Sequence, residues 1–417
     1  MTPDPSPTQD PQDRDRRERR RRVAIRRARR RGLTRLAIAL AGVAVAIVVI
    51  SQFGGGSTGD SGHVATTGSG RQADPGGAHG VPPLLDPHDV YAADRPGRLS
   101  PVVRNFPSRI YVPNSDSNTV SVINPSTYKV IDEFPVGVQP QHVVPSYDLK
   151  TLWVNNDQGN SLTPIDPRTG KPGRTVPVSD PYNLYFTPDG RYAIVVSERL
   201  QQLNFRDAHT MRLHHSLSIP CSGPNHMDFT ADGRYLLLSC EFDGKLIEVD
   251  VANEKVVRSI PLDPAGAPQD VKLSPDGKTF YVADMDSNGV WMVDAKSMRK
   301  IGFIPTGMGA HGLYVSRDSR YLYVSNRMEG SVSVISFATR KVVHKWRIPG
   351  GGSPDMGGVS ADGKVLWLTG RYNAEVYAIS TQDGRLLARI PVGNGPHGLC
   401  VYPQPGRYSL GHTGVFR

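Results

Sequence analysis

Residues 268–307 decide the fold, and they read PQDVKLSPDGKTFYVADMDSNGVWMVDAKSMRKIGFIPTG. Residues 271–273 alternate apolar and polar, residues 275–277 supply the Asp-Gly turn of a hairpin, and a second β-rich run follows. Two more apolar runs, at 290–293 and 300–304, come after short polar turns. The stretch therefore predicts four short antiparallel strands joined by tight turns.

The same unit returns every 42 to 44 residues between about Ser108 and the C-terminus. Its tight turns are each followed by Arg or Lys and an apolar run, and they end at Gly190, Gly233, Gly277, Ser319 and Gly363. A period near 40 built from short strands is typical of a β-propeller, because one such unit cannot bury both of its faces alone.

The number of units and the way the ring closes also follow from the repeat. Seven inner strands are expected to start near Pro140, Pro181, Pro224, Pro268, Ala310, Pro354 and Pro396. The last start has no further strands after it, whereas residues 110–134 supply three strands with no inner strand before them. The two ends should complete one blade, which leaves no exposed sheet edge. We expect an all-β, seven-bladed propeller of four-stranded antiparallel blades over residues 108–403.

Three motifs resemble those of a known family. Residues 111–114 (YVPN), 118–123 (NTVSVI) and 391–398 (PVGNGPHG) are similar to the YVTN-type seven-bladed propellers, which include the YncE-like proteins. The resemblance covers roughly residues 108–403. Propellers of this kind include binding modules, lactonase-like enzymes and domains that hold haem d1, so the resemblance predicts the fold and leaves the activity open.

The residues before the propeller divide by composition. Residues 1–35 hold 13 Arg against 5 acidic side chains, which gives a net charge of +8 out of +10 for the chain. Residues 36–53 are uncharged and mostly apolar, and they predict one N-terminal transmembrane helix acting as a signal anchor. Residues 54–107 are rich in Gly, Ser, Pro and Asp and predict a flexible linker.

The Arg cluster beside this apolar segment predicts the topology. By the positive-inside rule, residues 1–35 stay cytoplasmic and the propeller is extracytoplasmic at the cell membrane. No small-x-small cleavage site with a polar flank follows the apolar run, which favours an uncleaved anchor; if the segment is cleaved, the protein is secreted. Nucleic-acid binding by the Arg cluster is disfavoured, because the adjoining membrane segment accounts for the charge.

An extracytoplasmic position would place the three cysteines in an oxidising space. Cys221 lies in the loop before one inner strand and Cys240 at the end of the next strand, on the same face, so a disulfide between them is one hypothesis. Thiolate binding to a metal ion is the alternative. Cys400 lies in the middle of the closing strand and is expected to be a small buried apolar residue.

In the layout that the resemblance implies, the residues after each recurrent Pro surround the mouth of the central channel. The candidate ligand-binding residues at these positions are His142, Asn183, His226, Asp270, His311 and His397. The four histidines are candidate metal or haem ligands or proton shuttles. The alternative is that polar side chains merely line a water-filled channel. The sequence alone identifies neither a cofactor nor a catalytic residue.

A second ring of polar side chains is expected at the ends of the second strands, on the same face. Arg199, Arg327 and Arg371 offer forked donors to a carboxylate or phosphate, and Glu241 can act as acid, base or cation ligand. The alternative is a network of salt bridges between blades. The C-terminal tail, residues 404–417, is expected to be disordered or to pack over a propeller face, where His412 or Arg407 could complete a site.

Two functions from different classes remain. The first is a membrane-anchored, extracytoplasmic scaffold that binds a protein, glycan or small molecule through its loop face and channel mouth. The second is a metal- or haem-dependent oxidoreductase or a lactonase-like hydrolase with its site at the channel mouth. Local catalytic and phosphate-binding motifs appear only in unsuitable contexts, so an enzyme would have to use residues from several blades. The sequence does not indicate an oligomeric state.

Overall fold

The computed structural model describes residues 80–264, 266–412 and 416–417, all of which belong to one compact unit. The predicted cytoplasmic tail, the predicted transmembrane segment 36–53 and residues 54–79 of the predicted linker lie outside the described residues. Within the described part of the chain, no helix is long and apolar enough to cross a membrane.

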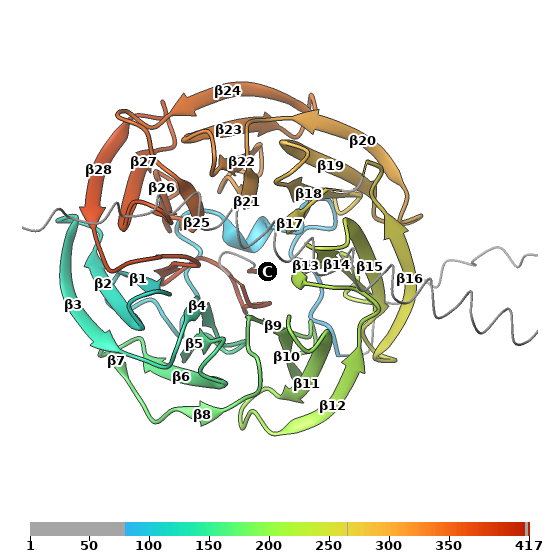
Figure 1. The fold of residues 1–417 in the computed structure, drawn as a ribbon, viewed down its shortest axis with the longest axis horizontal. Helices are drawn as coiled ribbons and strands as arrows, with labels where there is room; N and C mark the ends of the chain where they lie inside the picture. Colours follow the sequence, from blue (N-terminus) through green and yellow to red (C-terminus); the bar gives the residue numbers. More distant parts are fainter. Residues whose placement is uncertain (1–79, 265, 413–415) are drawn as a thin grey trace, which may run out of the picture. The chain divides into compact units, whose positions relative to one another are not determined.

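Seven β-sheets are arranged around one axis as the blades of a propeller (Figure 1). We number the blades from the first complete one along the chain. The strands of blades 1 to 3 are β4 (Pro140–Pro145), β5 (Leu152–Asn156), β6 (Ser161–Asp166), β7 (Lys171–Pro172) and β8 (Val176–Pro177); β9 (Asn183–Phe186), β10 (Tyr192–Ser197), β11 (Gln202–Asp207) and β12 (Leu213–Ser218); and β13 (Pro224–Phe229), β14 (Tyr235–Cys240), β15 (Lys245–Asp250) and β16 (Lys255–Pro261).

The remaining blades follow the same order from the axis outward. The strands of blades 4 to 6 are β17 (Pro268–Leu273), β18 (Thr279–Asp284), β19 (Gly289–Asp294) and β20 (Lys300–Pro305); β21 (Ala310–Val315), β22 (Tyr321–Asn326), β23 (Ser331–Ser336) and β24 (Lys341–Arg347); and β25 (Pro354–Val359), β26 (Val365–Gly370), β27 (Glu375–Ser380) and β28 (Leu386–Pro391). Blade 7 consists of β29 (Cys400–Tyr402), β1 (Arg109–Asn114), β2 (Thr119–Asn124) and β3 (Lys129–Pro135). A short 3-10 helix, η1, spans Ala92–Asp94.

The blades have four antiparallel strands, as the sequence predicts, with one local departure in blade 1. Its outer strand is divided into β7 and β8, which both pair with β6. Pro172 and Gly173 stand at the break, and proline has no N–H to continue the ladder. The interruption is therefore a local effect of these two residues and leaves the inner strands unchanged.

The hydrophobic core lies between neighbouring blades. For example, Leu237 and Leu246 of blade 3 pack against Val271 and Phe280 of blade 4 in one buried cluster. The outer strands are different, since β24 carries mostly exposed or half-exposed side chains. Each blade thus buries its two faces only against its neighbours, and this dependence accounts for the repeat in the sequence.

The hairpin turns between the first and second strands require a left-handed backbone at one position. Gly190 (φ 73°), Gly277 (φ 69°) and Gly363 (φ 78°) adopt it without steric cost. In blade 5 the residue is Ser319 (φ 57°), whose hydroxyl donates to the Asp89 carboxylate at 3.0 Å. We call the face that carries these turns the turn face. The inner strands begin on the opposite face, which we call the mouth face.

Blade 7 closes the ring by joining the two ends of the propeller. β29 pairs antiparallel with β1, from Arg109 opposite Tyr402 to Tyr111 opposite Cys400. The strand is shorter than the run expected from Pro396, because Gly398 bridges instead to His142 of β4. A Cβ at Gly398 would lie 2.0 Å from Nδ1 of His142, so only glycine permits this approach.

Both flanking segments pack on the turn face. In the N-terminal segment, Val90 and Tyr91 are buried, and the Val90 N–H donates to the carbonyl of Pro275. The prediction of a flexible linker is therefore wrong for residues 80–107, because apolar side chains there reach the core. In the C-terminal tail, Arg417 donates to Asp228 at 3.1 Å. The chain ends at the centre of the ring (Figure 1).

We predict that closure by β29 is required for cooperative folding. A full-length chain stopped after Gly395 lacks β29 and the tail, whereas one stopped after Pro403 lacks only the tail. The first should show no cooperative thermal transition by circular dichroism, because β1 loses its partner and becomes an exposed edge. The second should unfold cooperatively at a lower midpoint. A wild-type midpoint and cooperativity in the shorter chain would contradict this account.

Candidate functional site in the central channel

The inner strands place six predicted residues together at the centre of the ring. His142 lies on β4, Asn183 on β9, His226 on β13, Asp270 on β17 and His311 on β21. His397 precedes β29, and all six residues are at most 2% exposed to solvent. Because every inner strand starts beside the axis, the first residues of different blades meet there. The structure then separates the four histidines among them into two groups.

The first group surrounds the carboxylate of Asp355 on β25. His311 Nδ1 lies 3.0 Å from Oδ1, and His397 Nδ1 lies 2.8 Å from Oδ2. Arg327 donates to Oδ1 through Nε at 2.8 Å, and it also donates to Nε2 of His311. A neutral His311 therefore accepts this hydrogen bond at Nε2. The proton of its ring then lies on Nδ1, which faces the Asp355 carboxylate. Asp355 thus orients two of the four predicted metal ligands.

The charge of Asp355 follows from this environment. Burial alone would raise the pKa of its carboxyl group, but the Arg327 guanidinium and the two imidazoles outweigh burial and hold the pKa well below its usual value. Asp355 is therefore an ionised carboxylate inside the channel. The Asp355 group, made of Asp355, His311, His397 and Arg327, is a charge-compensated network that links three blades.

The second group consists of His142, His226 and His412. His412 belongs to the C-terminal tail, and its backbone N–H donates to the carbonyl of Leu184 at 2.9 Å. The Asn183 amide nitrogen lies 3.0 Å from Nδ1 of His226 and 3.2 Å from Nδ1 of His412. The ring centroids lie 5.3 Å apart for His142 and His226, 5.2 Å for His142 and His412, and 4.5 Å for His226 and His412. We call these residues the imidazole triad.

Burial keeps the channel imidazoles neutral. It lowers the pKa of His142 and of His226 well below the ordinary histidine value. The pKa of His397 falls to about 3, since burial outweighs the Asp355 carboxylate, which raises it. For Asp270, burial raises the pKa, but Lys272 and His412 outweigh this effect and lower it. The channel therefore holds neutral imidazoles beside ionised carboxylates at neutral pH.

The predicted second ring divides into paired residues and one guanidinium nitrogen that has no partner. Arg199 lies 2.6 Å from Asp180 and 3.5 Å from Asp157, so it joins blades 1 and 2. Glu241 accepts a hydrogen bond from Asn225 at 3.0 Å, and Arg327 belongs to the Asp355 group. The Nη1 atom of Arg371 is buried and has no hydrogen-bond partner in the described part of the chain.

Tyr182 shows that several of these charges share the mouth of the channel. Burial is the main cause that raises the pKa of its hydroxyl, and the carboxylates of Glu198 and Glu241 raise it further. The guanidinium groups of Arg371 and Arg327 act in the opposite direction. Positive and negative side chains of four blades thus act on one phenol at the mouth of the channel.

Cys221 and Cys240 form a disulfide with an S–S distance of 2.16 Å. A bonded pair offers no thiolate to a metal ion. Cys400 is free and buried, and burial raises the pKa of its thiol far above the ordinary value. The three cysteines therefore contribute to the structure around the channel without supplying a ligand to it.

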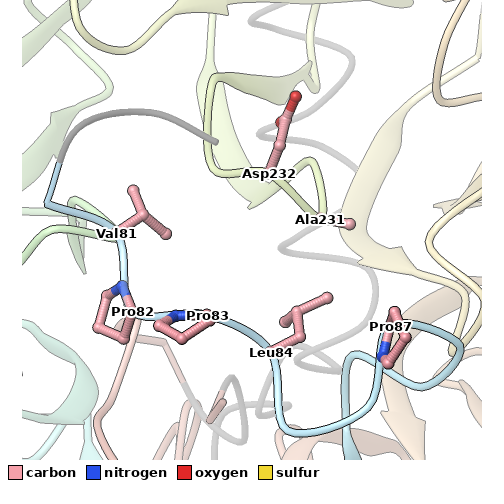
Figure 2. A pocket seen from close by; sticks show the side chains of 7 residues that line it. All are labelled: Val81, Pro82, Pro83, Leu84, Pro87, Ala231 and Asp232. Carbon is pink, nitrogen blue, oxygen red and sulfur yellow. The ribbon is translucent and has the colours of Figure 1, made fainter. Parts of the chain in front are cut away.

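A surface pocket of about 430 Å³ lies on the turn face, away from these groups. Figure 2 shows its lining, which comes from the N-terminal segment and from the turn after β13. Asp232 is the charged residue of the lining, and it accepts a hydrogen bond from the Thr230 hydroxyl at 2.5 Å within its own turn. The lining thus supplies no acid–base pair, and the chemistry-bearing residues described above lie in the channel instead.

The packing of the channel limits what it can hold. The ring centroids of His142 and His397, which belong to different groups, lie 4.8 Å apart, and those of His311 and His397 within the Asp355 group lie 5.8 Å apart. A tetrapyrrole is several times wider than one imidazole and would have to displace these rings, so haem does not fit this arrangement. A single ion or a small molecule fits the residue types and the spacing better.

Sequence reasoning found the inner-strand residues but did not commit to His412. Its position in a tail without repeats gave no signal except its residue type. The repeat also places Asp355 at the channel mouth, directly after Pro354, although it is not among the candidate ligand-binding residues named from the sequence. The repeat register is the signal that identifies its position, but not its contacts with His311 and His397.

We predict that the stability of the protein falls steeply in acid. Between pH 3 and about 6.5, the unfolded chain binds a proton at His397 and the folded chain does not, so the free energy of unfolding falls as pH falls through this window. In metal-free buffer, His397→Gln should reduce the slope of this free energy by about 1.4 kcal/mol per pH unit. His344→Gln changes an exposed residue of β24 and should leave the slope unchanged. Urea titrations at several pH values measure the free energy of unfolding of the wild type and of both variants. An equal pH dependence of this free energy in the wild type and in His397→Gln would contradict the prediction.

Comparison with known proteins supports the fold described above. The model of the YncE-like β-propeller family matches residues 99–406. The uncharacterized protein YncE of Salmonella typhi is 23% identical over 272 residues, which cover 59% of this chain and 73% of that protein.

Solved structures of similar fold include two enzymes. The dihydro-heme d1 dehydrogenase NirN has a TM-score of 0.56 and 17% identity, with 79% of this chain and 82% of that chain covered. The Pseudomonas aeruginosa periplasmic gluconolactonase PpgL has a TM-score of 0.59 and 18% identity, with coverage of 70% and 98%. At these identities the likeness concerns the fold. The match of the family model over most of the chain shows that this protein belongs to the YncE-like β-propeller family.

Proposed function

We propose that the protein is a membrane-anchored, extracytoplasmic β-propeller that binds a small anion at the mouth of its central channel. The observation that carries this proposal is the Nη1 atom of Arg371, which is buried and has no hydrogen-bond partner among the described residues. A buried donor without a partner is unfavourable by about 1–3 kcal/mol, and this favours a ligand oxygen at that place.

The surroundings of Arg371 suit a carboxylate or a phosphate group. Its charge lowers the pKa of both the Tyr182 hydroxyl and His397, so its field reaches the Asp355 group. A guanidinium presents two parallel N–H groups to such an anion. Arg327 adds a second positive charge, while its contact with Asp355 holds it in place. The proposed ligand would accept from Arg371 and lie against the Tyr182 ring.

The burial of the mouth supports a small ligand rather than a protein or a glycan. Tyr182 and Glu241 are each 9% exposed, and Arg327 is 3% exposed. A polymer bound at the loop face would contact the rim and would not reach these side chains. Binding of a protein or glycan by the loops is therefore a separate activity that this site does not require.

The anion proposal predicts stabilisation by phosphate or citrate. We expect one of these two probes, titrated separately into the full-length protein in detergent, to raise the thermal midpoint in a saturable manner, because a ligand that binds the folded state stabilises it. Arg371→Met should abolish the increase. The matched control is Arg385→Met, which removes an exposed guanidinium on the outer part of the same blade and should preserve it. No saturable shift with either probe, or an equal shift in Arg371→Met, would count against the proposal.

The anchoring part of the proposal rests on the sequence and on one structural feature. Residues 36–53 are apolar and follow the Arg cluster. The Cys221–Cys240 disulfide supports an oxidising environment, where such bonds persist.

We predict that the full-length chain stays in the membrane fraction of a bacterial host after carbonate extraction. A chain that lacks residues 36–53 should be found in the soluble fraction, because it has lost the apolar segment. Added protease should reach the propeller of the full-length protein in spheroplasts. Full-length protein recovered in the soluble cytoplasmic fraction would contradict both the anchor and the topology.

The imidazole triad favours a second candidate function, a metal-dependent oxidoreductase or hydrolase. Neutral imidazoles are suitable metal ligands, and a bound metal ion can polarise a substrate or activate water. In this function the small anion would be the substrate or part of it. The two candidates therefore share the channel mouth and differ in whether the bound anion undergoes a reaction.

A further inference from the structure

Three histidines from distant parts of the chain meet at one point in the channel. His142 comes from blade 1, His226 from blade 3 and His412 from the C-terminal tail. One ring nitrogen of each lies within 4.8 Å of the corresponding nitrogens of the other two. All three side chains are fully buried.

The nitrogens of this triad have unusually few partners. Neither nitrogen of His142 makes a hydrogen bond within the described residues, and the same holds for Nε2 of His226 and Nε2 of His412. Buried polar atoms in native proteins nearly always have a partner, and an ion or an ordered water molecule supplies it where the protein does not. Three such atoms, together with Nε2 of His412, which lies 3.6 Å from Asp270 Oδ1, point to a bound species at the centre of the cluster.

We propose that His142, His226 and His412 bind one divalent transition-metal ion of the zinc class. Imidazole nitrogen is a preferred ligand of Zn²⁺, Cu²⁺ and Ni²⁺. Three histidines leave at least one coordination position for water or for a ligand. The ion would lie beneath the channel mouth, so this site is additional to the proposed anion site and does not depend on it.

The geometry of the triad is close to what such an ion needs. Two nitrogens bound to one zinc ion at about 2.1 Å can be at most about 4.2 Å apart, so the widest separation of 4.8 Å requires a small inward movement. His412 belongs to a tail outside the blades, and such a segment can make this adjustment more easily than an inner strand.

Neighbouring side chains would position the ligands. The Asn183 amide nitrogen contacts Nδ1 of both His226 and His412. Because an amide nitrogen donates, binding of an ion through Nε2 requires that Nδ1 carry the ring proton and that the Asn183 amide turn to present Oδ1 to both rings. Such contacts to the second nitrogen fix the orientation of metal-binding imidazoles. Asp270 Oδ1 lies 3.6 Å from Nε2 of His412 and provides negative charge near the ion, although Lys272 is close to the same carboxylate.

The other two channel histidines have different roles in this assignment. His311 and His397 direct Nδ1 toward Asp355, and Arg327 donates to Nε2 of His311. They therefore belong to the Asp355 group beside the ion. The ligand set that we propose differs from the four inner-strand histidines suggested by the sequence, because His412 takes the place of these two.

Titration with Co²⁺ alone tests the proposal on the full-length protein in detergent. The protein is treated with chelator, dialysed and titrated, while the visible absorption of tetrahedral Co²⁺ and the metal content are measured. We expect one ion per chain, displaced by Zn²⁺. His412→Ala and His142→Leu should each weaken binding by about 100-fold or more, because loss of a residue that only orients a metal ligand already costs about 10–100-fold.

Two control variants separate the triad from other sites. His214→Ala with His215→Ala removes an exposed histidine pair that contacts Glu254, and it should leave Co²⁺ binding unchanged. Arg371→Met should also bind Co²⁺ normally, so failure of the anion proposal and failure of the metal proposal are distinguishable. Thermal unfolding of each metal-free variant shows whether it is folded. If the His142→Leu variant does not fold, the Co²⁺ affinity of the His412→Ala variant tests the proposal. Absence of stoichiometric binding, undiminished binding in His412→Ala, or loss of binding in the His214 and His215 variant would overturn the proposal.

Discussion

The pairing of β29 with β1 is the interaction on which the rest of the structure depends. It joins residues near the two ends of the propeller and converts a row of seven blades into a ring. In a ring, every blade has a neighbour on both sides, so each apolar face is covered and no sheet edge remains open. The ring also brings the start of every inner strand to one axis, and this creates the channel.

Convergence on one axis explains why the centre is polar. The inner strands bring His142, His226, His311, Asp270 and Asp355 into a space from which bulk water is excluded. Buried charges are tolerated only when they are paired, and Asp355 meets this condition through Arg327 and two imidazoles. In the imidazole triad, by contrast, buried ring nitrogens lack hydrogen-bond partners among the described residues. This difference between the two groups motivates the proposed ion.

The terminal segments give the two faces of the ring different roles. The N-terminal segment and the tail pack against the hairpin turns, with Tyr91 donating to the carbonyl of Leu273 and Arg417 donating to Asp228. The tail also sends His412 into the channel from that side. The mouth face keeps the ring of Glu241, Arg327 and Arg371. In the proposed function, a ligand therefore enters from the mouth face, whereas the two terminal segments cover the turn face.

The sequence by itself determined the blade number, the four-stranded pattern, the closing strand and the place of the recurrent residues after each Pro. These features follow from strand periodicity and turn residues, which act locally and repeat along the chain. Only the tertiary structure decided that Arg199 pairs with Asp157 and Asp180, that His311 and His397 face Asp355, and that His412 joins His142 and His226. Such contacts join segments as much as 270 residues apart, from His142 to His412, and they depend on side-chain distances across the axis, which no local pattern encodes.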